Sequence, residues 1–328
     1  MITGRQIEAF HAVFSIGSMT GAARHLGRTQ SAVSRLIMEL EKALCFTLFE
    51  RNGTRLHATQ EARLLYDEVK RSFIGLKNIE EKARQIAAGG NHRRITCGAT
   101  SALSGGLVPR AISGLMQCSS DISMSFKGMP ADDVVRSVTD GSVDVGLATL
   151  PIDDTNLHIH WIGEASCVAV LHEDHPLAQS DSLSLRQLHT QQVLTVGNPF
   201  RLRRTIDAAL QASGNSSFTR IETNTSLNAV MSAREELGVA IVEPVTAYGI
   251  PIGGTVVRPI VEHIPWAWSV LTPAFSAADS GILRFIEQIE ITARALLPDF
   301  IRHPPEALEK LHTRLFQTEP GAPDAKRN

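Results

Sequence analysis

The chain has 328 residues, 43% of them hydrophobic, and a formal net charge of −2. This length supplies ample material for two or three folded units with cores of their own. No stretch of eighteen apolar residues occurs, and no apolar segment typical of a signal peptide precedes the first predicted helix, so we expect a cytoplasmic protein with no membrane contact.

Charge is unevenly distributed along the chain. Residues 1–94 contain 15 Lys and Arg against 9 Asp and Glu, net +6, whereas residues 95–328 contain 17 against 25, net −8. A basic N-terminal part joined to an acidic remainder is typical of a DNA-binding module attached to a part that does not bind DNA.

Residues 18–55 predict a helix–turn–helix followed by a basic hairpin. Ser18 can cap a short helix, Gly27 ends it, and Thr29 caps a second helix over about residues 30–44. Apolar residues of the second helix face inward, and its polar N-terminal end suits a recognition helix in the major groove. The alternative is an ordinary helical hairpin with a solvated polar face. The residues expected to contact DNA on this helix are Thr29, Gln30, Ser31, Ser34 and Arg35.

The flanking segments strengthen the DNA-binding interpretation. An apolar stripe over residues 7–14 predicts a first helix that covers the inner face of the motif. Downstream, TLFERNGTRLHAT forms two β-like runs about the turn Asn52-Gly53, a strong hairpin signal. Arg51 and Arg55 flank this turn and suit a wing that lies along phosphates. Residues 1–59 therefore predict a winged helix–turn–helix domain.

Residues 60–90 predict one long helix and a hinge at Gly89-Gly90. Apolar residues recur along the helix with a strict 3,4,3,4 spacing, which makes the narrow seam that a coiled coil or an antiparallel helix pair buries. We expect a second copy of the chain to cover this seam. The alternative is that the helix packs back on its own globular part. The residues expected to form the dimer seam are Leu65, Val69, Leu76 and Ile79.

The first ninety or so residues resemble the LysR-type transcriptional regulators. The matching segments occur in order and without gaps, and they are QIEAFHAV, GSMTGAARHL, TQSAVSRLIMELE, LFER and RLHATQEA. One departure is Ser31, where the family usually has Pro, although Ser is acceptable in a first helical turn. The resemblance implies that Gln30, Ser34 and Arg35 contact DNA and that the long helix dimerises. Segments QIEAF, TQSAVSR, LFER and EVKRSFIGL are also similar to the opine and basic-amino-acid catabolic regulators within the family.

Beyond the hinge the pattern changes to alternating strands and helices, which indicates an α/β fold with largely parallel sheets. The LysR-type resemblance extends over about 300 residues and implies a two-lobed, periplasmic-binding-protein-like effector domain over residues 91–303. Its first lobe would comprise about residues 91–163 and 265–303, and its second about residues 164–264. Residues 304–328 predict a partly disordered extension that begins with a short amphipathic stretch.

Ligands of such domains bind where strand C-termini and helix N-termini face a cleft. At these junctions the chain carries hydroxyls, amides and free helix N–H groups suited to a carboxylate or another anion. Each residue also has a simpler reading, because Ser, Thr and Asn cap helices in every fold. The family places its inducers in this cleft, which supports Thr100, Ser101 and the Asn198 region best. The full candidate set is Thr100, Ser101, Gly128, Met129, Asn198, Pro199, Phe200, Asn224 and Thr225.

Three other chemistries have weak support in the sequence. His158 and His160 could share one strand face, but no third ligand has recognisable spacing, so neither a metal nor a cofactor is predicted. No nucleophile–base arrangement is readable, so no enzyme activity is expected. Some LysR-type regulators sense peroxide through a cysteine pair in the second lobe, where this chain has only Cys167, in an apolar run.

We therefore expect a LysR-type regulator, dimeric or tetrameric, that binds an interrupted palindrome in promoter DNA. It would respond to a small anionic metabolite, with an amino-acid derivative as one option, and act on RNA polymerase. Two alternatives stay open. One is a thiol redox switch on the same scaffold, and the other is a ligand-binding or catalytic α/β protein whose N-terminal module is only an anchor.

Overall fold

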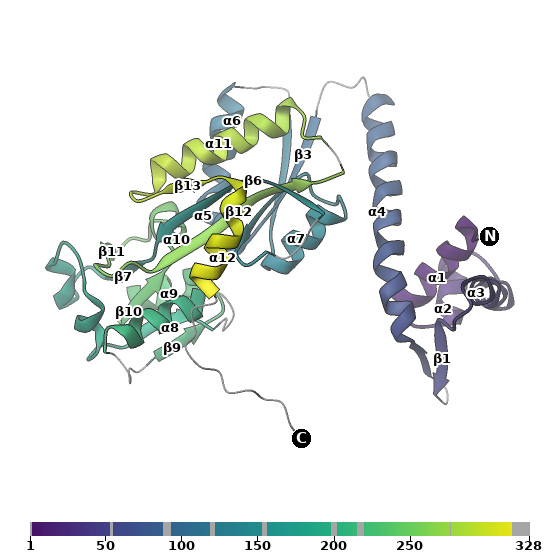
Figure 1. The fold of residues 1–328 in the computed structure, drawn as a ribbon, viewed down its shortest axis with the longest axis horizontal. Coiled ribbons are helices and arrows are strands. Elements are labelled where there is room, and N and C mark those ends of the chain that lie inside the picture. The colour runs from purple at the N-terminus through teal and green to yellow at the C-terminus, as the bar shows by residue number, and fades with distance from the viewer. Residues whose placement is uncertain are drawn as a thin grey trace. The chain divides into compact units, whose positions relative to one another are not determined.

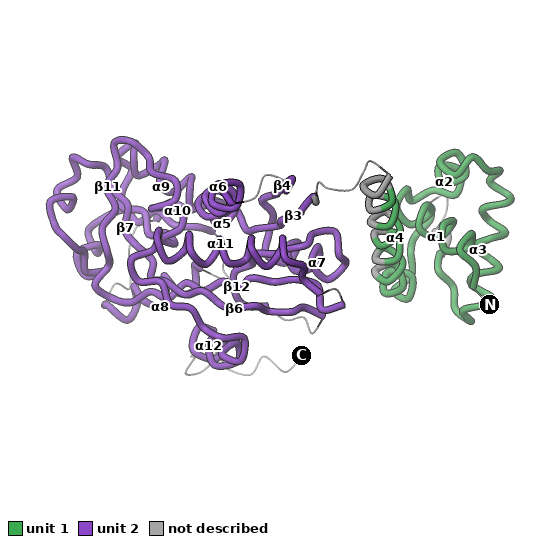
Figure 2. The backbone as a smooth tube through the Cα atoms, turned by 90° about the horizontal axis from the view of Figure 1, so that it is seen from above, with its two compact units in different colours: residues 1–88 green, residues 89–328 purple. Residues whose placement is uncertain are grey.

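The computed structural model describes residues 2–52, 55–87, 93–118, 122–152, 156–197, 202–214, 220–275 and 277–316. The chain divides into two units, residues 1–88 and 89–328 (Figure 2). The predicted hinge at Gly89-Gly90 lies outside the described residues. No helix in the described ranges is both long and apolar enough to cross a membrane.

The N-terminal unit is a three-helix domain followed by a hairpin and a long helix (Figure 1). Its elements are α1 (Gly4–Ile16), α2 (Met19–His25), α3 (Gln30–Leu44), β1 (Phe49–Asn52), β2 (Arg55–Ala58) and α4 (Gln60–Ala87). The predicted caps are confirmed: the hydroxyls of Ser18 and Thr29 accept hydrogen bonds from the backbone N–H groups of Gly21 and Ala32.

The core of this unit joins the recognition motif to the helix before it. Val33, Ile37 and Leu40 of α3 are almost fully buried, as are Phe10 of α1 and Leu48 before the hairpin. These residues are spaced three and four apart on α3, so one face of the helix is buried and the opposite face stays exposed. The inward-facing stripe predicted for this helix is thus present.

The N-terminal half of α4 packs on its own domain, and this packing involves two of the four residues predicted for the dimer seam. Val69 is only 4% exposed and belongs to the core of the N-terminal unit, and Leu65 packs partly against the same core. Leu76 and Ile79, further along the helix, are 57% and 66% exposed. Leu76 and Ile79 therefore offer exposed apolar surface beyond the part of α4 that packs on the domain.

The C-terminal unit contains two sheets (Figure 1). The first sheet has the order β13-β6-β12-β5-β3-β4. Its strands are β3 (Arg93–Ala99), β4 (Ile122–Gly128), β5 (Val145–Thr149), β6 (Leu157–Ser166), β12 (Pro265–Pro273) and β13 (Ile301–His303). Its helices are α5 (Ser101–Gly106), α6 (Val108–Cys118), α7 (Ala131–Thr139), α11 (Ser280–Leu296) and α12 (Leu308–Phe316), with a 3₁₀ turn η3 (Pro305–Ala307).

The second sheet has the order β11-β7-β10-β8-β9. Its strands are β7 (Val168–His172), β8 (Val193–Val196), β9 (Arg220–Thr223), β10 (Val239–Val242) and β11 (Thr255–Pro259). Its helices are α8 (Leu202–Ala212), α9 (Ser226–Arg234) and α10 (Pro244–Gly249), with 3₁₀ turns η1 (Pro176–Gln179) and η2 (Leu185–Leu188).

Both sheets are mixed rather than largely parallel. The predicted β–α–β runs give parallel pairs, β3 with β4 and β5, and β8 with β9 and β10. Each sheet also contains a strand that runs in the opposite direction: β12 pairs antiparallel with β5 and β6, and β7 pairs antiparallel with β10 and β11. The chain crosses at Cys167 and Ile264, whose backbones share a 2.8 Å hydrogen bond.

Two glycines allow α5 of the first lobe to touch α10 of the second. A Cβ atom on Gly106 would lie 2.2 Å from the carbonyl oxygen of Val245, and one on Gly249 would lie 2.4 Å from the carbonyl oxygen of Gly106. A larger residue at either position would push the two helix backbones apart. The close approach joins the two sheets at a second point beside the crossing strands.

Candidate functional site

The N-terminal end of α3 presents an exposed polar surface. Thr29, Gln30, Ser31 and Arg35 are exposed, and Ser34 is half-buried against the domain. The hydroxyls of Thr29 and Ser31 lie 3.1 Å apart. This end of the helix therefore offers hydroxyls, an amide and a guanidinium in one place, as the sequence predicts for a helix that reads base edges.

Arg35 is held along the helix surface by a neighbouring acid. Its Nε donates to Oε1 of Glu39 at 2.9 Å, and the Arg35 side chain is 78% exposed. An exposed pair of this i,i+4 kind is worth only about 0.3–0.5 kcal/mol. The guanidinium can therefore leave Glu39 for a base edge or a phosphate at little cost.

The predicted hairpin is confirmed by the pairing of its two strands. β1 and β2 are antiparallel, with Arg51 opposite Leu56 and Asn52 opposite Arg55. The turn at Gly53 and the side chains of Arg51 and Arg55 lie outside the described residues. The backbone thus places both arginines at the end of a wing next to the recognition helix.

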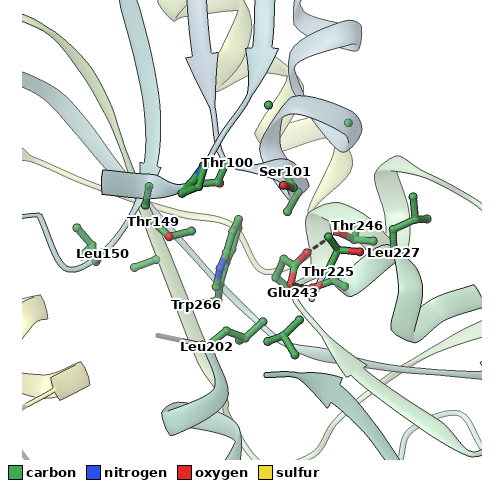
Figure 3. Close-up of a pocket in the computed structure, with 18 of the residues that line it drawn as sticks. Thr100, Ser101, Thr149, Leu150, Leu202, Thr225, Leu227, Glu243, Thr246 and Trp266 are labelled. Atoms are coloured by element: carbon green, nitrogen blue, oxygen red, sulfur yellow. Dashed lines mark hydrogen bonds between the residues drawn. The ribbon is translucent and has the colours of Figure 1, made fainter. Parts of the chain in front are cut away.

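A cleft of about 620 Å³ lies in the C-terminal unit, between its two sheets (Figure 3). It is built at the C-terminal ends of parallel strands from both sheets. Thr100, Gly128 and Thr149 stand at the ends of β3, β4 and β5, while Asn224 and Glu243 follow β9 and β10. Strand ends of this kind are where α/β folds bind ligands, because helix N-termini and loop side chains converge there.

Six of the nine predicted effector residues line this cleft. They are Thr100, Ser101, Gly128, Met129, Asn224 and Thr225. The other three, Asn198, Pro199 and Phe200, lie outside the described residues. Val196 and Leu202, on either side of that segment, also line the cleft.

Thr100 has an unsatisfied hydroxyl at the cleft. Its Oγ1 is buried and has no hydrogen-bond partner among the described residues, and as the N-cap of α5 it makes no side-chain capping bond. The Thr100 side chain therefore does not cap α5. Leaving a hydroxyl unpaired costs free energy, so a ligand group that bonds Thr100 would recover part of that cost.

For Asn224 and Thr225 the structure shows a helix-capping role instead. The Thr225 hydroxyl accepts from the backbone N–H of Asn228 at 3.2 Å and so caps α9. The side-chain amide of Asn228 donates to Oδ1 of Asn224 at 2.8 Å. Both residues line the cleft, but their oxygens already serve the first turn of the helix.

Several cleft residues were not among the predicted candidates. Thr149 and Glu243 follow buried strands, so the strand-end rule that selects Thr100 selects them as well. Trp266 lies between these two sides of the cleft in Figure 3. It occupies the start of the returning strand β12, and no local pattern marks it as a binding residue. The other unpredicted polar and large apolar side chains are Asp132, Leu150, Val196, Leu202, Thr205, Ser226, Leu227, Thr246, Ile250, Leu315 and Phe316.

Glu243 is a buried carboxyl at the cleft. Its side chain accepts hydrogen bonds from Oγ of Ser226 at 2.5 Å and from Oγ1 of Thr246. Burial raises the pKa of Glu243 above its ordinary value, although the two hydroxyl bonds act in the opposite direction. This carboxyl joins the first residue of α9 to α10 and faces the space where a ligand would lie.

The C-terminal extension supplies one wall of the cleft. Leu311 of α12 is 4% exposed and packs in a core with Val134 of α7, and Leu315 and Phe316 line the cleft itself. The sequence indicates this amphipathic stretch but does not show that it folds onto the effector domain. Residues 317–328 lie outside the described ranges.

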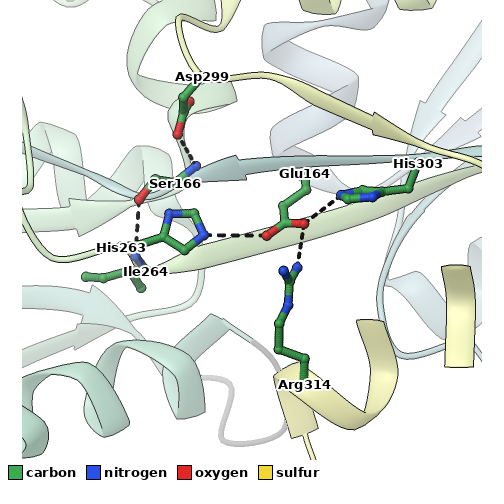
Figure 4. Close-up of polar contacts among 7 residues, drawn as sticks. All are labelled: Glu164, Ser166, His263, Ile264, Asp299, His303 and Arg314. Atoms are coloured by element: carbon green, nitrogen blue, oxygen red, sulfur yellow. Dashed lines mark hydrogen bonds and ion pairs between the residues drawn. The ribbon is translucent and has the colours of Figure 1, made fainter. Parts of the chain in front are cut away.

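Glu164 fixes α12 in place (Figure 4). It is 1% exposed, and its carboxyl accepts from Nη2 of Arg314 at 2.5 Å, from Nε2 of His303 at 2.7 Å and, more weakly, from Nε2 of His263 at 3.5 Å. Burial alone would raise the pKa of Glu164, but the bonds from Arg314, His303 and His263 hold it below its ordinary value. An acid from β6 is thus tied to three basic groups that lie far along the chain from it.

We predict that Arg314→Gln loosens α12 without unfolding the domain. Loss of the ion pair should speed amide hydrogen exchange in residues 308–316 by about tenfold or more, because local opening needs less free energy than global unfolding. Arg302→Gln is the matched control, since Arg302 pairs with Glu290 at 3.0 Å away from α12. Equal exchange in both variants and the parent would show that Glu164 does not hold the helix.

Metal binding and thiol redox sensing gain no support from the geometry of the described residues. His158 and His160 pack edge to face with ring centroids 4.5 Å apart, and Nε2 of His160 bonds Oγ1 of Thr272 at 3.0 Å. Within the described ranges no third His, Cys, Asp or Glu completes a metal-binding group. Cys167 is buried, and burial raises the pKa of its thiol, which opposes the thiolate needed for reaction with peroxide.

Comparison with known families assigns both units. Residues 4–63 match the bacterial regulatory helix–turn–helix protein of the lysR family, and residues 88–293 match the LysR substrate binding domain. The chain belongs to the LysR family. It is a LysR-type transcriptional regulator with an N-terminal DNA-binding helix–turn–helix and a C-terminal effector-binding domain.

Curated relatives cover most of the chain. The regulatory protein NocR of Agrobacterium fabrum is 31% identical over 279 residues, which are 84% of this chain and 92% of that protein. The octopine catabolism/uptake operon regulatory protein OccR of Rhizobium meliloti is 33% identical over 250 residues, 74% of this chain and 80% of its own. The transcriptional activator protein LysR of Escherichia coli is 27% identical over 287 residues, 86% of this chain and 90% of its own.

Solved LysR-type structures share the fold. A full-length OxyR variant from Pseudomonas aeruginosa has a TM-score of 0.64 at 16% identity and covers 93% of this chain and 99% of its own. Full-length CbnR in complex with its target DNA has a TM-score of 0.64 at 19% identity, with 88% of this chain and 99% of its own covered. These likenesses show that the arrangement of elements is that of full-length LysR-type regulators.

Proposed function

We propose that this LysR-type regulator binds an interrupted palindrome in promoter DNA as a dimer or tetramer, and that a small metabolite bound in the cleft changes its effect on RNA polymerase. Thr29, Gln30, Ser31, Ser34 and Arg35 read the DNA, and the wing arginines Arg51 and Arg55 contact phosphates. The exposed polar end of α3 supports DNA reading. The exposed apolar residues Leu76 and Ile79 support assembly through α4. Promoter DNA places this activity in the cytoplasm.

The effector we propose carries an anionic group that binds at Thr100 and Ser101. The observation that carries this proposal is the buried, unpartnered Thr100 hydroxyl at the end of β3. Ser101 is exposed beside it in the same cleft. The relative OccR is named for octopine catabolism and uptake, and octopine is an amino-acid derivative, so an effector of amino-acid origin is consistent with this cleft.

Control of transcription would arise from the two-lobed construction. The cleft is lined by residues of both sheets, so a ligand that contacts both lobes stabilises one relative arrangement over another. Such a ligand shifts the population of the oligomer between two states that hold the DNA-binding domains differently. The bend of the bound DNA would change with that shift.

The two alternative classes receive less support. A thiol switch would need a pair of reactive cysteines, but Cys97 and Cys167 are buried, and the exposed Cys45 and Cys118 belong to different units. An enzyme would need an accessible nucleophile next to a base, whereas Ser226 and Thr246, whose hydroxyls bond Glu243, are buried, at 8% and 2% exposed, and join α9 to α10. We therefore propose binding without catalysis and without a cofactor.

Thr100→Val tests the effector site. The substitution keeps the shape of the side chain but removes the hydroxyl, at a cost of about 1–3 kcal/mol to the bound ligand. A promoter–reporter strain is titrated with a panel of small carboxylates and amino acids. The variant should need roughly tenfold or more of the active compound, while operator affinity stays unchanged and thermal stability is equal or higher, since an unpaired hydroxyl is lost.

Thr292→Val is the matched control, because the Thr292 hydroxyl bonds only the Gln288 carbonyl of its own helix in the described contacts. It should respond like the parent. Unchanged sensitivity in Thr100→Val would place the effector elsewhere. Lost operator binding in Thr100→Val would mean that Thr100 supports the fold rather than the site.

A further inference from the structure

Glu243 is a buried acid with no cationic partner among the described ion pairs. The side chain is 2% exposed and lines the cleft. Its recorded side-chain hydrogen bonds come from the neutral hydroxyls of Ser226 and Thr246. Among the ion pairs of the described residues, none involves Glu243, in contrast to Glu164, where an arginine and two histidines surround the buried acid.

A purely structural role does not require an acid at this position. The contact between α9 and α10 needs only a partner for each of the two hydroxyls. The carbonyl oxygen of a neutral amide would accept from one hydroxyl, and its N–H would donate to the other, since hydroxyls can also accept. A buried carboxylate without a cation is costly, so a neutral residue would suit the fold better. The carboxyl borders the open cleft, where a cationic group of a ligand can reach it.

We propose that Glu243 is the subsite for a cationic group of the effector, an ammonium or a guanidinium. The inference rests on the proposed function and makes its ligand class narrower. Thr100 and Ser101 bind the anionic end of the ligand, and Glu243 binds the cationic end. Trp266 lines the same cleft (Figure 3) and offers an aromatic surface to the aliphatic stem or to the cation itself. The effector class is therefore zwitterionic, that of a basic amino acid or its derivative.

Matched pairs of amino acids test the subsite on the full-length protein. L-arginine is compared with its neutral isostere L-citrulline, and L-lysine with L-norleucine, by isothermal titration calorimetry. A charge-assisted bond to a buried carboxylate should favour at least one cationic member over its neutral partner by about ten- to a hundredfold. In Glu243→Gln that preference should fall to about threefold or less, because the amide keeps the shape but not the charge.

A second measurement separates binding from folding. Without ligand, Glu243→Gln should unfold at the same temperature as the parent or higher, since a buried unpaired acid is removed. Glu262→Gln is the matched control: Glu262 also accepts a serine hydroxyl bond, from Ser184 at 2.6 Å, but does not line the cleft. It should retain the full preference for the cationic amino acid.

The inference is wrong if the parent prefers neither L-arginine nor L-lysine over its neutral partner. It is also wrong if such a preference survives in Glu243→Gln. A Glu243→Gln protein that unfolds at a lower temperature than the parent would overturn it as well. The inference alone fails if neither basic amino acid binds while another carboxylate still controls the reporter through Thr100. The proposed function itself fails if no small molecule changes the reporter response.

Discussion

Replacing Arg35 with Ala should abolish operator selection while leaving the protein folded. The Arg35 side chain is 78% exposed and its one recorded ion pair is with Glu39 on the same helix, so its loss should change the free energy of unfolding by less than about 0.5 kcal/mol. Loss of a guanidinium that bonds a base edge costs about 1–3 kcal/mol in the free-energy difference between operator and random DNA. This is roughly a ten- to hundredfold loss of specificity. Gln30→Ala, more than one turn earlier, should have an effect of the same kind.

The measurement is a band-shift titration of operator DNA against random DNA of equal length at several salt concentrations. Arg55→Ala in the wing is the comparison: it should weaken binding to both DNAs equally and lower the salt slope by about one. Arg35→Ala should instead bring operator affinity down toward that of random DNA. Full operator preference in Arg35→Ala would contradict the assignment of α3 as the recognition helix.

A charge at Leu76 should separate the subunits. Leu76 and Ile79 are 57% and 66% exposed in the single chain, and they lie three residues apart on one face of α4. In a two-fold interface each substitution occurs twice, so Leu76→Asp buries two uncompensated charges. The cost should exceed about 3 kcal/mol, more than a hundredfold in the dimerisation constant.

Light scattering on the full-length variants measures this directly. Leu64→Asp is the matched control, because Leu64 is on the same helix, 68% exposed, but outside the predicted seam. It should keep the mass of the parent. Val69→Asp serves a different purpose: Val69 is buried in its own domain, so this variant should unfold the N-terminal unit rather than only dissociate it. A Leu76→Asp protein with unchanged mass would show that α4 does not dimerise through this face.

The N-terminal unit could be predicted closely because its signals are local. Ser18 and Thr29 cap helices three residues from the N–H groups they bind, and the periodicity of α3 fixes its buried face. The extent of the dimer seam could not be read in the same way. The 3,4,3,4 spacing continues from Leu65 to Ile79, and only the folded domain shows that Val69 is already covered.

The cleft was predictable only as far as its residues stand at the ends of the parallel strands in the two mixed sheets. Thr100 and Gly128 could be found by that rule, and Thr149 and Glu243 satisfy it as well. Trp266 enters the cleft from an antiparallel strand far along the chain from Thr100, and Phe316 arrives from the C-terminal extension. Their positions depend on long-range packing, including the Glu164–Arg314 pair across 150 residues, for which the sequence holds no local signal.

A DNase I footprint tests the central claim most directly. The full-length protein is placed on the DNA upstream of its own gene, with and without the compound that activates the reporter. We predict protection of an interrupted palindrome. In the parent, the protected region or its hypersensitive sites should change when the compound is added. In Thr100→Val they should not change at the same concentration. Protection with no sequence preference, or a footprint that no effector changes, would contradict it.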